Sequence, residues 1–490
     1  MDQATQKKYN QWQWKTIIIL MIGYAMFYLV RKNLSFAMPV LGAEFGITKT
    51  QLGLFLTLHG VIYGLSRYVV GIITDRNSAR KVMSLGLLLC ALVNILFGCS
   101  DFLARLLLGI SATAGDGAAL ASALVYIMGT LWMVNGFLQG MGVPPCTKTL
   151  TQWIKPEELA TKMSIWNMSH SIGAGLAIAL CGWIVIPHMG ADLSGNPDAV
   201  AAIAANLGLS DLSDPKVLNF AAHYGAWRWC FLIPAAVALV GSAFLFFTMK
   251  DSPSDVGLPE IVGKKKKAIV TTPEEAAEHA AFVKKHVYGN RIIWTLAIAN
   301  FFVYVVRFAC LDWGPTFLTE NKGLSMATAT TLMLFFEFVG GNLGMVFWGW
   351  ATDHIFHSKA HHTSLICMIG VALCALAFWK LPADASWFWL MLVFMLIGFF
   401  IYGPQALLGI CAAQHATNRA SATANGILGI FGYASTIVSG VGFGFVADHY
   451  GWDGTYLTVV IAAAVTILIL ATMWGAKATG YEEEAPAENA

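Results

Sequence analysis

Two arginines interrupt long apolar runs of the sequence at matching depth. Arg31 lies fifteen residues into a run that begins near residue 16, and Arg307 lies fifteen residues into a run that begins near residue 292. An arginine at the middle of a bilayer costs from about 2.5 to more than 10 kcal/mol, so each charge must face water or an anion. Two guanidinium forks can each give a parallel pair of hydrogen bonds. That arrangement suits a tetrahedral dianion, of which phosphate is the simplest.

A structural interpretation of these arginines is the alternative. Arg31 and Arg307 would then pair with Glu337 and Asp312, although pairing alone gives no reason for their equal depth. Glu337 lies midway along another apolar run. We expect it either to balance charge there or to tune the basic site so that a bound dianion can also leave.

The composition is that of a membrane protein. The chain has 490 residues, of which 57% are hydrophobic and only 12% charged, and its mean hydropathy is +0.63. Soluble domains carry about twice that charge fraction. A net charge of +2 without a stripe of basic residues argues against a nucleic-acid-binding protein. Nine cysteines are scattered without a Cys-x-x-Cys pair, and four histidines at 354–362 lie in a loop without cysteine. We therefore expect no metal, no cofactor and no nucleic-acid partner, and a monomer in the bilayer.

Twelve apolar runs are each long enough to cross a bilayer, which takes roughly 20 residues in a helix. They fall near residues 16–38, 50–74, 82–100, 119–142, 160–187, 226–248, 292–313, 326–352, 364–381, 386–408, 419–446 and 453–475. The runs are too long for strands, so the sequence predicts an all-α membrane protein with twelve transmembrane helices. A polar linker at 249–291 separates a six-helix half, 1–248, from a second half, 292–490, with a short acidic tail.

Short motifs repeat between the two halves. TDRNSARK follows the second run and TDHIFHSK follows the eighth, so that Asp75 and Asp353 take equivalent places. Arg31 and Arg307 are separated by nearly the same length of chain as these two aspartates. Paired six-helix repeats around a central site are a known transporter plan. We therefore expect two pseudo-symmetric halves whose arginines meet across a central cleft. Asp75 and Asp353 are expected to lock the cytoplasmic ends of the helix bundles.

Basic residues in short loops orient a membrane chain, because they stay on the cytoplasmic side. Here they lie between the second and third runs, between the fourth and fifth, and in the lysine cluster at 264–267. The long loop at 188–225 carries a single lysine. Both termini are therefore expected in the cytoplasm. No small-residue cleavage site follows the first run, which is expected to stay as a helix. The insert at 190–217 has no functional interpretation from sequence.

Several motifs together resemble the organophosphate:phosphate antiporter family of the major facilitator superfamily. They are GYAMFYLVRKNLSFAMP (23–39), GMGVPPC (140–146), WNMSHSIG (166–173), NFFVYVVRFACLDWGPTFL (300–318) and FFIYGPQALLGICAA (399–413). The family includes bacterial glycerol-3-phosphate and hexose-6-phosphate transporters and a hexose-phosphate sensor. The resemblance covers both halves. It implies the major facilitator fold and exchange of a phosphorylated metabolite for inorganic phosphate by alternating access, in a bacterial inner membrane.

The resemblance also implies roles for charged residues. Arg31 and Arg307 become the phosphate-binding pair, and His170 becomes the third binding residue, with simple packing as its alternative. A histidine gains its proton near the pH at which phosphate gains its second one, so it can follow the charge of the ligand. Lys32 and Asp312 match positions thought to link the halves. We expect them to form a gating ion pair, and two separately solvated charges are the alternative.

Two departures from the family pattern bear on the substrate. Arg67 stands where the family often has a lysine, which keeps the charge and changes its geometry. Asn425 and Leu428 stand where the best-known hexose-phosphate transporter carries an Asp and a Lys. Their presence favours membership of the glycerol-phosphate branch of the family. The stretches at 78–98 and 397–413, in contrast, resemble the hexose-phosphate branch. We expect glucose-6-phosphate as the substrate, with glycerol-3-phosphate as the alternative.

Side chains near the charged residues are candidates for binding the organic part of the substrate, and packing is an equal alternative for them. They are Tyr28, Tyr304, Asn300, Trp166 and Asn425. A hexose ring needs more hydrogen-bond partners than glycerol does, and the amides of Asn167, Gln139 and Gln405 are further partners within the runs.

Three other functions compete with antiport. A membrane phosphatase or transferase would use His170, but the sequence has no paired carboxylates, Ser-His-Asp order or phosphate-binding glycine loop, so we do not expect an enzyme. A proton-coupled importer needs an ionisable carboxylate in the pathway, for which Glu337 is the candidate. A sensor would bind sugar phosphate and signal to a partner kinase. Nothing in the sequence separates such a sensor from a carrier.

Overall fold

The computed structural model describes residues 3–109, 117–154, 162–163, 165–259, 277, 280–357, 359–382 and 385–476. These residues form helices, and their only β pairing is an isolated bridge. The α-helices before the linker are α1 (Gln3–Leu29), α2 (Leu34–Phe45), α3 (Lys49–Arg76), α4 (Ala79–Gly98), α5 (Ser100–Leu108), α6 (Gly117–Gln139), α7 (Val143–Trp153), α9 (Ser169–Ala179), α10 (Ile186–His188), α11 (Pro197–Leu207), α12 (Pro215–Ala222) and α13 (Trp229–Thr248).

The α-helices after the linker are α15 (Arg291–Glu320), α16 (Met326–Leu334), α17 (Gly341–His354), α18 (Ala360–Lys380), α19 (Trp387–Ala434) and α20 (Phe443–Thr472). Short π-helical turns occur at η1 (Leu180–Val185), η4 (Lys284–Tyr288), η5 (Phe335–Gly340) and η6 (Ile437–Gly442), and 3₁₀ turns at η2 (Ala226–Arg228) and η3 (Pro253–Val256). π turns inside α-helices are rare, and those that occur often lie at functional sites.

Eleven segments of the described residues are long and apolar enough to cross a membrane. The last of them, Thr423–Thr472, covers both the eleventh and the twelfth expected runs. Within it, Gly451 has φ 67° and ψ −169°, which interrupts helix α20 between the two runs. Glycine adopts this backbone conformation without the steric penalty that other residues meet. The prediction of an all-α fold with twelve crossings is therefore confirmed.

The first expected span is not one continuous helix. Helix α1 ends at Leu29 and α2 begins at Leu34, so the chain is irregular at 30–33. Arg31 and Lys32 both lie in this break. The expected helix over residues 16–38 is therefore interrupted at Arg31. Such breaks are tolerated within a membrane where neighbouring helices satisfy the freed backbone groups.

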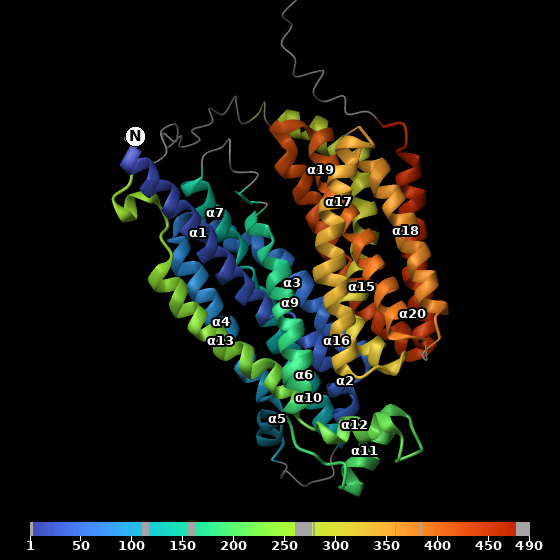
Figure 1. Cartoon of the computed structure of the whole chain (residues 1–490). Helices are drawn as coiled ribbons and strands as arrows, with labels where there is room; N and C mark the ends of the chain where they lie inside the picture. Colours follow the sequence, from blue (N-terminus) through green and yellow to red (C-terminus); the bar gives the residue numbers. More distant parts are fainter. Residues whose placement is uncertain are drawn as a thin grey trace, which may run out of the picture. The chain divides into compact units, whose positions relative to one another are not determined.

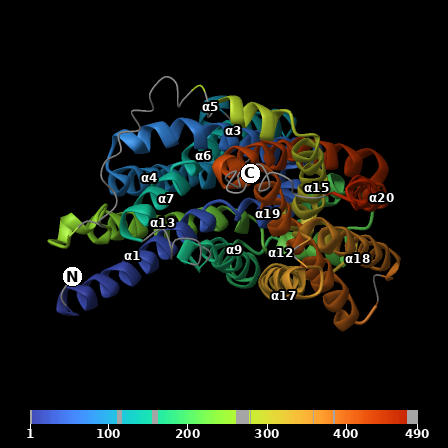
Figure 2. The same ribbon diagram turned by 90° about the horizontal axis from the view of Figure 1, so that it is seen from above.

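The helices gather into two compact units, Met1–Lys265 with Gly314–Thr330, and Lys266–Trp313 with Thr331–Ala490. Helix α15 therefore begins in the second unit, and its last turns belong to the first. Within the first unit α4 packs along α13, and α3 packs along α6 (Figure 1, Figure 2). Within the second unit α18 packs against both α19 and α20 (Figure 1).

The insert of the fifth loop folds as a small helical cap on α2. The chain enters and leaves it through a bridge between Ala191 and Tyr224, and α11 and α12 follow in between. Asn206 Nδ2 donates to the carbonyl of Ala43 on α2 at 2.9 Å. The apolar cluster beneath the cap comprises Ala43, Val200, Ile203, Ala204, Val217 and Ala221. Figure 1 shows α11 and α12 beside the labelled end of α2. The insert is thus a packed part of the first unit.

Candidate functional site

In the first unit, Arg31 lies among tyrosines from two helices. Its guanidinium carbon is 4.1 Å from the ring centroid of Tyr63 on α3 and 5.3 Å from that of Tyr28 on α1. The guanidinium carbon of Arg67 lies 5.9 Å from the same Tyr63 ring. Each such contact is worth roughly 0.5–2 kcal/mol, more where water is excluded. The structure thus groups two cations around one aromatic ring.

An aromatic chain continues from Arg31 to His170. The rings of Tyr28 and His170 are 5.9 Å apart, and Tyr24 lies 5.4 Å from Tyr28 and 5.1 Å from Trp166. His170 is 8% exposed. Its Nδ1 donates to the carbonyl of Asn167, and its Nε2 lies 3.4 Å from the hydroxyl oxygen of Ser171. The first unit therefore brings together four residues that the sequence singled out: Arg31, Tyr28, Trp166 and His170.

In the second unit, Arg307 on α15 is buried, with 7% of its surface exposed. Its Nη2 donates to the hydroxyl of Tyr402 at 3.3 Å, and that hydroxyl donates to the carboxylate of Glu337. Its guanidinium carbon lies 5.0 Å from the ring of Tyr402, 5.6 Å from Phe308 and 5.9 Å from Tyr304. Glu337, on the π turn η5, is thus joined to Arg307 through one hydroxyl group.

Two amides singled out for the organic part of the substrate have other surroundings. Asn300 Nδ2 donates to the carbonyl of Leu428 at 2.9 Å, which ties α15 to α19. Asn425 lies on the exposed side of α19. Gln139 is also engaged, since its Nε2 donates to the carbonyl of Phe27 at 3.0 Å. The structure gives Asn300 and Gln139 a part in helix packing.

The remaining charged residues lie in the helix break, in the interior of α15 and near helix ends. Lys32 follows Arg31 in the break and is half-buried, and Asp312 is buried on α15, between one and two turns after Arg307. Asp353 is exposed near the end of α17. Asp75 falls near the end of α3, and its side chain lies outside the described part of the chain, as does the lysine cluster at 264–267.

The histidines near residue 357 contact their own surroundings. His354 bonds the carbonyl of Trp350, and His362 Nε2 donates to the carbonyl of Trp474 at 2.7 Å while stacking on its ring. His362 and its neighbour His361 lie in the first turn of α18, both buried. These contacts tie the start of α18 to the end of α20.

Sequence analysis missed Tyr63 and Tyr402. Tyr63 precedes Arg67 by four residues, which places both on one face of a helix. Tyr402 lies within the motif FFIYGPQ, but its direction depends on how α19 packs. The four-residue spacing from Arg67 could have identified Tyr63 as a site residue. No local sequence pattern indicated that Tyr402 contacts Arg307.

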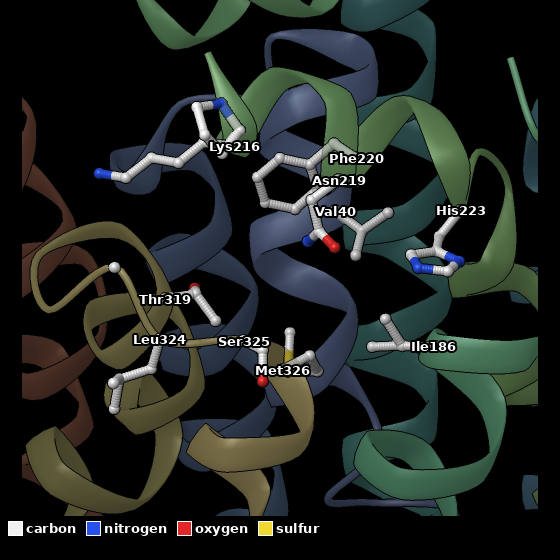
Figure 3. Close-up of a pocket in the computed structure, with 12 residues that line it drawn as sticks. Val40, Ile186, Lys216, Asn219, Phe220, His223, Thr319, Leu324, Ser325 and Met326 are labelled. Atoms are coloured by element: carbon white, nitrogen blue, oxygen red, sulfur yellow. The ribbon is translucent and has the colours of Figure 1, made fainter. Parts of the chain in front are cut away.

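A cavity of about 230 Å³ lies elsewhere in the first unit, under the insert. Figure 3 shows Asn219, Phe220 and His223 of the insert region around it, opposite Thr319 and Ser325. Lys216 at its edge donates to the backbone carbonyl of Glu320 at 2.9 Å. Its lining has one lysine and no arginine, so this cavity is a poor match to a phosphate dianion. We do not assign the site to it.

Comparisons with known proteins identify the family of the chain. Residues 20–439 and 328–489 match the Major Facilitator Superfamily model. The chain is 32% identical to the glycerol-3-phosphate transporter of Bacillus subtilis, over 96% of this chain and 95% of that one. It is 30% identical to the Probable hexose phosphate transport protein of Chlamydia muridarum, over 97% and 93%. It is also 30% identical to the membrane sensor protein UhpC of Escherichia coli, over 94% and 92%.

The fold has a solved counterpart. A bacterial homologue of the human lysosomal transporter Spinster superposes with a TM-score of 0.67 at 16% identity, over 94% of this chain and 97% of that one. At that identity the likeness concerns the fold alone. The relatives identified by sequence include transporters of phosphate esters and a sensor. This chain is therefore an integral membrane protein of the major facilitator superfamily and belongs to its organophosphate:phosphate antiporter family.

Proposed function

We propose that the chain exchanges a sugar phosphate for inorganic phosphate by alternating access, in a bacterial inner membrane with both termini in the cytoplasm. One observation carries the proposal: each compact unit holds one arginine, at matching depth in its first apolar run, against tyrosine rings. A cation–π contact orients a guanidinium without using its N–H donors. Such an oriented fork suits two parallel hydrogen bonds to phosphate oxygens. Arg31 and Arg307 together bind the phosphate group in this proposal.

His170 is the third phosphate ligand in the proposal. The bond from Nδ1 to the Asn167 carbonyl fixes the orientation of the imidazole ring. Protonation at Nε2 turns an acceptor into a donor, in the same pH range in which phosphate changes from dianion to monoanion. Glu337 lowers the net positive charge around Arg307 through Tyr402 and so favours release of the ligand.

Glucose-6-phosphate is the leading substrate. The relatives at similar identity include both a glycerol-3-phosphate transporter and a hexose phosphate transport protein, so their names support both candidates. Tyr28 and Trp166 lie in one aromatic chain with His170. Flat aromatic faces beside a phosphate site suit the apolar face of a sugar ring better than they suit glycerol.

Exchange in proteoliposomes tests the proposal. Liposomes that contain the purified chain and are loaded with phosphate are expected to take up radiolabelled phosphate from outside, with the rate unchanged by a protonophore. Glucose-6-phosphate is expected to block this uptake at a concentration at least tenfold below that of glycerol-3-phosphate. Unphosphorylated glucose and glycerol are the controls and should not compete, because the arginines bind the phosphate group.

The possible outcomes separate the alternatives. A tenfold preference for glycerol-3-phosphate would remove the hexose assignment and leave the antiport mechanism intact. Phosphate binding without any exchange would favour a sensor, the function named for one relative. Uptake that stops when the pH gradient collapses would favour proton-coupled import through Glu337.

A further inference from the structure

Three asparagines meet inside the first unit at the break that carries Arg31. They are Asn33 in the break, Asn94 on α4 and Asn135 on α6, and all three side chains are fully buried. Asn33 Nδ2 donates to Asn94 Oδ1 at 2.9 Å, and Asn94 Nδ2 lies 3.5 Å from Asn135 Oδ1. Buried amides need hydrogen-bond partners, and here their N–H groups find them in one another and in the backbone.

At the break, backbone carbonyls lose their helical hydrogen bonds and accept hydrogen bonds from side-chain amides instead. The N–H groups of Arg31 and Lys32 both bond the carbonyl of Tyr28, at 3.1 and 3.0 Å. The carbonyl that Arg31 would meet in a regular α-helix, that of Phe27, instead accepts from Gln139 Nε2. The carbonyl of Val30 accepts from Asn94 Nδ2 at 3.3 Å and from Asn135 Nδ2 at 3.2 Å. Two neighbouring helices thus supply donors for the broken turn.

We propose that Asn94 and Asn135 are positioning residues for Arg31. By holding the Val30 carbonyl, they fix the winding of the chain one residue before the guanidinium that lies over Tyr63. Successive side chains of an α-helix turn by about 100° per residue. A small change of winding at Val30 therefore turns Arg31 away from its place. The assignment rests on the proposed function, in which Arg31 binds phosphate.

A positioning role and a purely stabilising role give different binding curves. Asn135→Leu and Asn94→Leu remove the donors and keep a side chain of similar branched shape. If the asparagines position Arg31, the folded variants bind inorganic phosphate with a Kd at least tenfold higher than that of the unmodified chain. If they only stabilise the fold, the number of binding sites falls while the Kd of the remaining sites stays the same, and the proposal is overturned. Radiolabelled phosphate binding to the full purified chain measures both quantities.

A matched control is available between α13 and α4, away from the break. Ser242 Oγ on α13 donates to the carbonyl of Ser84 on α4 at 2.7 Å, and Ser242 is buried. Ser242→Ala therefore removes one buried side-chain bond to a backbone carbonyl away from the break. Its Kd for phosphate is expected to stay within twofold of the unmodified chain. A tenfold change in this control would show that any buried polar loss alters binding, and would overturn the positioning role.

Hydrogen exchange of the unmodified chain tests, without phosphate, the premise that the break is held in one conformation. The amides of Arg31 and Lys32 are expected to exchange at least a hundredfold more slowly than in an unstructured peptide, because the break is held. Free exchange at these amides overturns the positioning role, even if every leucine variant fails to fold. If the unmodified chain binds no phosphate, the proposed function fails. Faster exchange of these amides in Asn135→Leu than in Ser242→Ala still shows that the asparagine fixes the break, and equal exchange in the two variants overturns it.

Discussion

Replacing Arg31 or Arg307 by lysine is expected to lower the affinity for inorganic phosphate about 100-fold and to abolish measurable exchange. The charge is retained, but an ammonium group is a point charge that cannot give two parallel hydrogen bonds to phosphate oxygens. Removing a partner from a desolvated, hydrogen-bonded charge pair costs roughly 2–5 kcal/mol, a range that includes a 100-fold loss. Direct binding of radiolabelled phosphate to each purified variant measures the effect.

Arg80→Lys is the matched control for these variants. Arg80 lies on α4 with its guanidinium carbon 5.4 Å from the Phe246 ring, so it has a similar aromatic contact far along the helix from the break. Its replacement should leave phosphate affinity within twofold. If Arg31→Lys or Arg307→Lys kept near-normal exchange, the model of two guanidinium forks on one phosphate would be wrong.

Reversing the charge of Lys32 or Asp312 alone is expected to reduce exchange at least tenfold, and the double exchange of charges is expected to restore part of it. The physical reason lies in the proposed gating role, in which attraction between Lys32 and Asp312 stabilises one state of the carrier. A reversed charge replaces attraction by repulsion and biases the carrier to one side. Initial rates of phosphate exchange for Lys32→Asp, Asp312→Lys and the double variant provide the measurement.

The pair Lys49 and Glu320 supplies the comparison for this cycle. Their charged groups are 3.1 Å apart, and each side chain is about a quarter exposed. Pairs that water can reach contribute only about 0–1 kcal/mol, so charge exchange there should leave the rate of phosphate exchange within twofold. A double-variant cycle of Lys32 and Asp312 with a coupling energy below about 0.5 kcal/mol would exclude them as a gating pair.

The crossings were predictable because a bilayer imposes a length and an apolar composition on each of them. The break at Arg31 was not predictable for a specific reason. Val30 looks like an ordinary member of an apolar run, while the donors that stabilise the break, Asn94 and Asn135, come from helices that are distant in the sequence. An asparagine inside an apolar run carries no sign of which carbonyl it will meet.

The candidate site, too, could be predicted from the sequence only in part. The two arginines could be predicted as site residues from their depth along the apolar runs, because a charge inside a bilayer is costly and is usually functional. The link from Arg307 through Tyr402 to Glu337 depends on the rotation of α19 and η5 about their axes. Hydrophobic periodicity is weak in helices that are apolar on all sides, so the sequence says little about such rotations. For the same reason nothing in the sequence indicated that Asn425 lies on an exposed face of α19.

Helix α15 belongs to both compact units, and this bears on how the protein is made. Synthesis proceeds from the N-terminus, so residues 1–265 are in the membrane before Gly314–Thr330 emerges. The packing surface for that segment is therefore already present when the segment arrives, whereas the first unit stays incomplete until then. Translation of the second half thus completes the first. If the chain were cut within the linker, the C-terminal fragment would carry Gly314–Thr330, which packs in the first unit. That packing would favour association of the two fragments in the bilayer.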